Sequence, residues 1–258
     1  LYLRQSNAMQ ITLEKNGKKY SADLENPIDI SLAVSDFTRA WYINPPTFSP
    51  VRLGENWVGS VAEGGSVNFR DIHFNPHAHG THTECLGHVT EEVYSVNQLL
   101  KQHWFFAELV TVPVLQVGAD QILTASALKT AWKEPEIEAI VIRTSPNNPQ
   151  KATQNLSSTN WPFLAEDAAV LLRERGIKHL LIDQPSVDKE EDGGALAAHK
   201  AFWNIPENPR KNATITELIF VPDHILDGLY LLNLQVAPIE NDASPSRPVL
   251  FKVLELEG

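Results

Sequence analysis

A short segment of the chain, residues 73–88, concentrates side chains that can bind a metal ion. Neutral imidazole nitrogen and carboxylate oxygen are the ligands that zinc and similar divalent ions accept. Five of the nine histidines fall in this segment with one carboxylate among them, namely His73, His77, His79, His82, His88 and Glu84. The alternative interpretation is a surface loop that carries histidines, or polar side chains satisfied by packing. The clustering and the interleaved carboxylate favour a metal site.

The spacing within the segment allows several of these ligands to meet at one point. In an extended backbone, His82 and Glu84 point to the same side, because side chains alternate along a strand. Gly80 lets the chain turn tightly, which can bring His77 or His79 to the same place. Two histidines and one carboxylate then form a metal site that still has open positions.

An open coordination position suits catalysis better than a structural role. A water molecule bound there has its pKa lowered toward neutrality, so that hydroxide becomes available as a nucleophile. The reaction class that this chemistry predicts is carbonyl hydrolysis. The single cysteine, Cys85, follows Glu84 and faces the other way in an extended stretch, so we interpret it as a small buried apolar residue.

The charge and composition of the chain narrow its partners. The 258 residues carry a formal net charge of -11, which disfavours nucleic acid and anionic membranes as partners. We expect a small-molecule substrate.

The first eight residues resemble a cloning remnant, because Ser6-Asn7-Ala8 precedes Met9, the only methionine. A chain that starts at Met9 shows no signal-peptide pattern, which predicts a cytoplasmic protein.

Hydrophobic patterns predict a single α/β domain over residues 9–258, rich in strands. Strands are expected at residues 11–14, 28–34, 67–74, 108–117, 139–144, 177–183, 216–221 and 248–255. Helices are expected at residues 95–102, 124–132, 162–175 and 195–203. Pro113 favours an edge or a bulge for its strand.

Residues 36–66 are rich in proline, glycine and aromatic residues and are expected to form a long ordered loop. Long loops of this kind often bind ligands. Trp41 and Tyr42 lie in this segment and could stack on an aromatic substrate. Packing in the core is an equal alternative for both side chains.

At the histidine segment the sequence resembles the cyclase-type metal-dependent hydrolase family, which includes bacterial kynurenine formamidases and isatin hydrolases. The family pattern His-x-Gly-Thr-His-x-Asp-x-Pro-x-His corresponds here to Gly80-Thr81-His82-Thr83-Glu84-Cys85-Leu86-Gly87-His88. Further landmarks of the family occur in order along the chain, namely Asp29-Ile-Ser31, Asp183-Gln-Pro-Ser-Val-Asp188, His199, Glu217 and Ser246-Arg247-Pro248.

The resemblance implies a fold, a metal site and an acid/base residue. The implied fold is a β-rich α/β domain of the swivelling β/β/α-like type, with a mixed sheet and flanking helices. A first divalent ion, zinc or manganese, would be bound by His82, Glu84, Glu217 and the first motif histidine. A second ion, where two are present, would be bound by Glu84, His199 and Glu217. His88 would be the general acid/base that passes a proton to the leaving nitrogen. Family members are typically homodimers, which implies a homodimer or higher homo-oligomer here.

This sequence departs from the family pattern at three points. The position of the first motif histidine is Ala78, so His77 lies one residue too early and His79 one residue too late. We favour His77, brought into place by a one-residue bulge. Glu84 replaces the usual aspartate, and Leu86-Gly87 stands where the family has its proline and the residue after it. The departures affect the expected substrate more than the expected fold and metal site.

The expected function is hydrolysis of a small amide, such as an aryl formamide of the N-formylkynurenine type. This activity belongs to tryptophan catabolism. A cyclic amide or lactone, as in isatin hydrolysis, requires the same chemistry and is the first alternative. Two alternatives come from other classes: a metal- or ligand-binding protein without turnover, and a metal-dependent isomerase or dehydratase in which His88 moves protons on carbon.

Overall fold

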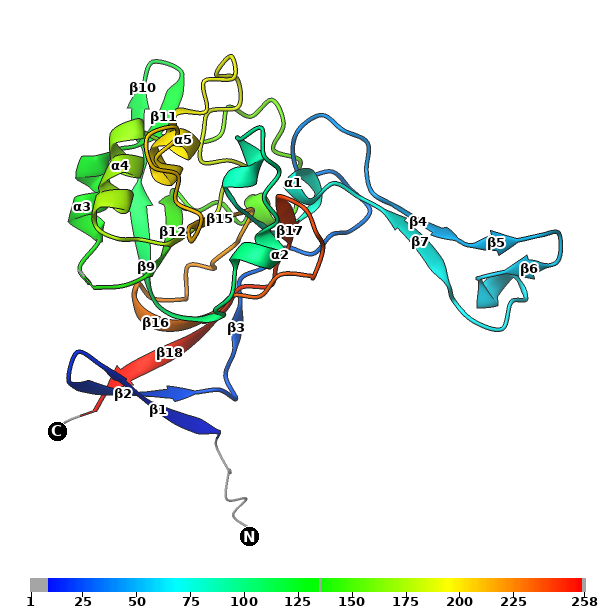
Figure 1. Ribbon diagram of the computed structural model, residues 1–258, viewed down its shortest axis with the longest axis horizontal. Helices are drawn as coiled ribbons and strands as arrows, with labels where there is room; N and C mark the ends of the chain where they lie inside the picture. Colours follow the sequence, from blue (N-terminus) through cyan, green and yellow to red (C-terminus); the bar gives the residue numbers. More distant parts are fainter. Residues whose placement is uncertain (1–8, 135, 257–258) are drawn as a thin grey trace, which may run out of the picture.

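A single large mixed sheet forms the centre of the molecule, and helices pack on it (Figure 1). The computed structural model describes residues 9–134 and 136–256, so the predicted cloning remnant at residues 1–8 lies outside the described residues. In spatial order the strands are β1 (Gln10–Lys15), β2 (Lys18–Asp23), β18 (Val249–Glu255), β16 (Gly228–Asn233), β9 (Trp104–Pro113), β12 (Ala139–Ser145), β14 (His179–Ile182), β15 (Thr214–Glu217), β8 (His82–Glu84) and β17 (Ala243–Pro245), with β3 (Ile28–Asp29) paired to β18. This architecture confirms the predicted mixed α/β fold.

The middle of the sheet is parallel and largely buried. Strands β9, β12, β14 and β15 run parallel to one another. Strand β12 begins with the apolar run Ala139-Ile-Val-Ile142 and is buried except at its last residue, as expected for a strand whose two faces are both covered. The helices α3 (Ala125–Ala131), α4 (Glu166–Glu174) and α5 (Ala197–Trp203) cover this region, with α3 and α5 each packed against α4. The core of the protein therefore lies between these helices and the parallel strands.

Local signals fix the ends of the predicted helices. The side chain of Thr124 accepts a hydrogen bond from Ala127 N and caps α3, as its position in the sequence predicted. Gly176 has a φ of 82° and ends the turn after α4, a conformation that favours glycine. The helix predicted at residues 162–175 begins later than expected, because Phe163–Leu164 forms the short strand β13.

The short elements complete the fold. Strand β13 joins β10 (Leu115–Val117) and β11 (Asp120–Leu123) in a small sheet. The short helices are α1 (Pro76–His79), α2 (Val96–Leu99) and the 3-10 turns η1 (Val61–Glu63), η2 (Leu86–His88) and η3 (Pro149–Ala152). In the part of the chain that the structure describes, no helix is long and apolar enough to cross a membrane.

A two-stranded arm projects from the body of the protein (Figure 1). Its root pairs β4 (Thr47–Pro50) with β7 (Arg70–His73), and its outer part pairs β5 (Arg52–Leu53) with β6 (Trp57–Val58). The prediction of an unpaired loop over residues 36–66 is therefore wrong for 47–58. The strand predicted at residues 67–74 is confirmed as β7. Side chains of β4 and β5 are mostly exposed, so these segments lack the alternating pattern that reveals a half-buried strand.

Other expectations also require correction. The strand predicted at residues 28–34 pairs only at Ile28–Asp29 and continues as an isolated bridge at Ser31. Strand β9 is central, between β16 and β12, so the edge position expected from Pro113 is wrong. Pro113 is tolerated there because the pairing of β9 with β16 ends at Leu109, which leaves that side of β9 without a partner strand at Pro113. Strands β2 and β16 were not predicted.

Candidate metal centre and substrate pocket

A single helical turn decides which histidine of the motif reaches the cluster. Asn75 caps α1 by accepting a hydrogen bond from His77 N, and Pro76 occupies the first helical position. The turn brings His77 Nδ1 to 3.1 Å from Glu84 Oε2. His79 instead lies with Nε2 3.0 Å from the carbonyl oxygen of Asn44. The histidine near the cluster is therefore His77, delivered by a helical turn where a bulge was expected.

Two adjacent strands supply the centre of the cluster. His82 and Glu84 lie on β8 with one residue between them, so their side chains project from the same face of the sheet. Glu217 lies on β15 directly opposite His82, and its Oε2 is 3.4 Å from His82 Nε2. Ligand atoms of these three residues all lie within 4.8 Å of one another, a spacing that could hold a metal ion.

His199 reaches the same cluster from α5. Its Nε2 lies 3.0 Å from Glu84 Oε1 and 3.6 Å from Glu217 Oε1. Asp188 accepts hydrogen bonds from the backbone N of Ala198 and of His199, and its Oδ2 also lies 2.6 Å from His199 Nδ1. One carboxylate thus caps the helix and fixes the imidazole ring, with the other ring nitrogen directed at the two glutamates.

His88 occupies the open side of the cluster. It ends the turn η2, and its Nε2 lies 4.0 Å from Glu84 Oε2. Ligand atoms of His77, Glu84 and His88 form a second group within 4.8 Å of one another. The rings of His77 and His88 stack with their centroids 4.3 Å apart. Since the His88 side chain is 31% exposed, it is the histidine of this group that a substrate can approach most easily.

Electrostatics favour extra positive charge in this cluster. Burial raises the pKa of Glu84, but the attraction of His88, His199 and His77 outweighs burial and holds that pKa well below its usual value. Burial lowers the pKa of His77, whereas its contacts with Asp242 and Glu84 raise it, with a net value of about 10. The pKa of His199 is likewise raised by Asp188 and Glu84 despite its burial. The carboxylates thus stabilise cationic charge among the histidines.

Two buried atoms show that the donor set fits a metal ion. Among the described residues, His82 Nε2 and Glu84 Oε2 have no hydrogen-bond partner, although both are fully buried. A buried polar atom without a partner is costly, commonly about 1–3 kcal/mol. The contact between His77 Nδ1 and Glu84 Oε2 is close but lacks hydrogen-bond geometry. Imidazole and carboxylate atoms left unpaired at one point are the arrangement that a divalent cation satisfies.

A pocket of about 320 Å³ opens beside the cluster. It is lined by Trp41, Ile43, Asn75, His77, Ala78, His88, Ser186, Leu196, His199 and Glu217. Trp41 packs edge-on against the buried Trp161, with ring centroids 5.0 Å apart, which fixes it as one wall. Tyr42 does not share this position. It is 61% exposed, and its hydroxyl donates a hydrogen bond to Glu190, so the structure separates the two aromatic residues predicted to bind substrate.

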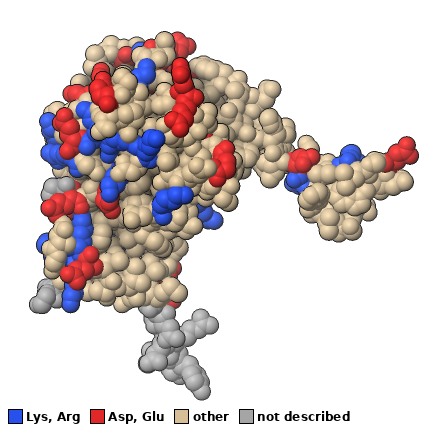
Figure 2. Space-filling model, in the orientation of Figure 1, with Lys and Arg blue, Asp and Glu red and all other residues tan. Residues whose placement is uncertain are grey.

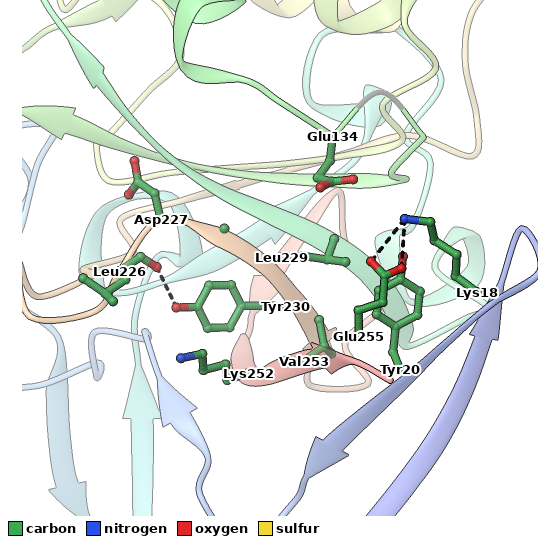
Figure 3. Close-up of a pocket in the computed structure, with 11 residues that line it drawn as sticks. Lys18, Tyr20, Glu134, Leu226, Asp227, Leu229, Tyr230, Lys252, Val253 and Glu255 are labelled. Carbon is green, nitrogen blue, oxygen red and sulfur yellow. Dashed lines mark hydrogen bonds and ion pairs between the residues drawn. The ribbon is translucent and has the colours of Figure 1, made fainter. Parts of the chain in front are cut away.

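A second cavity, of about 260 Å³, has no histidine among its lining residues (Figure 3). Residues of β2, β16 and β18 line it, and two of the lining residues, Lys18 and Glu255, form an ion pair. The hydroxyl of Tyr230 there donates to the carbonyl oxygen of Leu226. Within residues 9–134 and 136–256, neither group of ligands that could hold a metal borders this cavity, so the pocket beside the cluster is the better candidate for chemistry.

Sequence reasoning missed one residue of the site and left another open. Asp188 was identified only as part of a family landmark, without a role, and in the structure it both caps α5 and contacts His199. Asp242 was not singled out, because it belongs to no ligand motif; it immediately precedes β17, which pairs with β8. Cys85 is fully buried in the core, as predicted.

The fold and the site define an α/β protein that gathers histidines and carboxylates around one point at the end of a mixed sheet. The chain belongs to the family described as "Putative cyclase", whose sequence profile matches residues 28–189. A kynurenine formamidase from Bacillus thuringiensis (strain Al Hakam) is 29% identical over 231 residues, which cover 86% of this chain and 96% of that protein. A kynurenine formamidase from Bacillus anthracis is 28% identical over 231 residues, which again cover 86% of this chain and 96% of that protein.

Solved structures share the fold. A potential metal-dependent hydrolase with cyclase activity aligns with a TM-score of 0.63 and 17% identity, covering 88% of this chain and 97% of that one. An isatin hydrolase bound to the product analogue thioisatinate aligns with a TM-score of 0.60 and 16% identity, covering 88% and 92%. Taken with the family match, the comparisons support a hydrolase of the cyclase family.

Proposed function

We propose that this protein hydrolyses a small amide, with an aryl formamide of the N-formylkynurenine type as the substrate. The observation that carries the proposal is the convergence of His77, His82, Glu84 and Glu217 beside a pocket walled by Trp41. The relatives named kynurenine formamidase, which align along most of the chain, support this choice of substrate.

The proposed cofactor is a divalent metal, zinc or manganese, held in one or two positions. His77, His82, Glu84 and Glu217 would hold a first ion, and Glu84, Glu217 and His199 a second one. Such an ion would polarise the substrate carbonyl and lower the pKa of a water molecule. Zinc and manganese both accept imidazole and carboxylate ligands.

The residues of the chain supply binding and proton transfer. The apolar wall formed by Trp41, Ile43 and Leu196 binds the aryl group and excludes water around it. Water adds to the formyl carbon and the C–N bond breaks. Nε2 of His88 takes a proton from that water and passes it to the leaving nitrogen, so that formate and an aryl amine are released. His88 suits this role because it lines the pocket and contacts the cluster.

The direct test compares three substrates with one metal-replete preparation. We expect formate release from N-formylkynurenine to exceed ring opening of isatin or of a simple lactone. Faster isatin opening would contradict the formamide and favour the cyclic amide. Retained metal without turnover of any of the three would contradict hydrolysis and favour a metal-binding protein without catalysis.

We also propose that the protein assembles as a homodimer through its arm. A two-stranded ribbon is marginally stable on its own, and this arm exposes large apolar side chains, among them Leu53, Val61, Phe69 and Ile72. Figure 2 shows that the visible face of the arm is mostly uncharged. The root of the arm adjoins the pocket, which Ile43 and Asn75 line. Light scattering after size exclusion should give twice the chain mass of 28.7 kDa, and a monomer mass would contradict the proposal.

A further inference from the structure

One carboxylate oxygen lies between two histidines of the site. Asp242 Oδ2 is 3.0 Å from Nε2 of His77 and 3.2 Å from Nδ1 of His88. The opposite nitrogens of the two rings, Nδ1 of His77 and Nε2 of His88, are the atoms nearest Glu84. A single side chain therefore contacts the outer edge of both rings, on the side away from the cluster.

The backbone holds Asp242 in this place. The carbonyl oxygen of Asp242 accepts a hydrogen bond from Cys85 N, and the next residue, Ala243, pairs with Glu84 across β17 and β8. The preceding residue, Asn241, accepts a hydrogen bond from Val96 N through its carbonyl oxygen. An aspartate side chain is short, so a fixed backbone leaves its carboxylate little freedom.

An ionised carboxylate can only accept hydrogen bonds, so each ring nitrogen that bonds to it must carry a proton. The proton-bearing atoms are then Nε2 of His77 and Nδ1 of His88. In the neutral form of each ring, the lone pair must lie on the other nitrogen, which faces Glu84. The same contact thus sets the direction in which both rings can bind an ion or move a proton.

We propose that Asp242 is the positioning residue that fixes His77 as an Nδ1 ligand and His88 as an Nε2 proton carrier. The inference rests on the proposed function for its catalytic part, but the ring assignment follows from geometry alone. Asp242 is not among the residues that line the pocket, so it acts on the reaction through the two histidines.

The variant Asp242→Asn tests the proposal, because it keeps the shape of the side chain and removes its charge. Outer partners of ligand histidines typically contribute roughly 10–100-fold to metal affinity or activity. We expect Asp242→Asn to lower zinc affinity and kcat by about that factor and to leave KM nearly unchanged. Asp242→Glu should recover part of kcat. The matched control is Asp167→Asn, an exposed aspartate on α4, which should match the wild type.

A second measurement needs no variant at Asp242. Long-range ¹H–¹⁵N spectra report which ring nitrogen of a histidine carries the proton, with single-histidine substitutions to assign the signals. In the zinc-bound protein, we expect a proton on Nε2 but not on Nδ1 of His77, and a proton on Nδ1 of His88. The opposite tautomer of His88, or an Asp242→Asn protein with wild-type zinc affinity and kcat, would overturn the proposal. A wild-type protein that binds zinc without turnover would refute the proposed function, and zinc affinity and spectra would still decide the role of Asp242.

Discussion

His82 and Glu217 face each other across the antiparallel pair of β8 and β15, with Nε2 and Oε2 3.4 Å apart. This pairing joins the histidine motif to a carboxylate far along the chain. Both residues are buried, and Glu217 is further held because its Oε1 accepts a hydrogen bond from Val187 N. The sheet therefore positions the centre of the cluster.

His82 is expected to be essential for metal binding, because its buried Nε2 has no hydrogen-bond partner among the described residues. The His82→Ala protein should lose most of its bound metal by elemental analysis after dialysis. His224→Ala, which removes an exposed histidine outside the site, serves as the control and should retain the wild-type metal content. Full retention of metal by His82→Ala would refute the proposed ligand.

His88 is expected to affect turnover more than metal content. The His88→Gln protein should keep its metal, because His77, His82, Glu84 and Glu217 remain. Its kcat should fall by roughly 10²–10⁴-fold, the usual contribution of a general acid/base. Steady-state kinetics on an aryl formamide, paired with metal analysis of the same sample, measures both quantities. A kcat equal to that of the wild type would remove His88 from the mechanism.

Trp41 and Tyr42 provide a matched pair for testing the substrate pocket. Trp41 lines the pocket, whereas the neighbouring Tyr42 is exposed and bonded to Glu190. Trp41→Ala should raise KM for an aryl formamide by about tenfold, equivalent to about 1.4 kcal/mol of lost contact. Tyr42→Ala should leave KM nearly unchanged. Equal effects of the two substitutions would contradict this assignment of the pocket wall.

The buried His179, which lies outside the metal site, should make the free energy of unfolding depend on pH. Burial, with added repulsion from Lys178 and Arg210, lowers the pKa of His179 from 6.5 to about 3. The unfolded chain therefore gains a proton on acidification before the folded protein does. The contribution of His179 to the free energy of unfolding is therefore fully present above pH 6.5 and is lost as pH falls toward 3. The loss amounts to about 2 kcal/mol between pH 7 and pH 5. Urea unfolding of His179→Gln, whose amide can still bond to Thr214, should show a pH dependence weaker by that amount. An unchanged pH dependence would contradict the buried neutral histidine.

Much of the site could be predicted from local patterns. The alternation of β8 placed His82 and Glu84 on one side, and the structure has them there. The choice between His77 and His79 depended on how residues 76–79 fold. Asn75 followed by Pro76 is a readable signal for the start of a helix, and such a turn selects His77. The expectation of a one-residue bulge did not take this helix-start signal into account.

Long-range features were harder to predict. Asp242 approaches His77 and His88 only because β17 pairs with β8, and a strand pairing between distant segments leaves no local pattern. Of the arm, β7 was predicted by the strand at residues 67–74, whereas β4 and β5 escaped prediction because their side chains are mostly exposed on both faces. His199 and Glu217 were identified through the family resemblance. In the structure His199 lies beside Glu84, and Glu217 lies beside His82.

The most direct test of the central claim is a crystal structure of the metal-replete protein, with anomalous scattering to identify the ion. We predict an anomalous peak that marks a metal ion bound by His82, Glu84 and Glu217, with His77 as the fourth protein ligand. Ordered density that shows these four side chains paired with one another, with no anomalous peak between them at saturating zinc or manganese, would contradict the account.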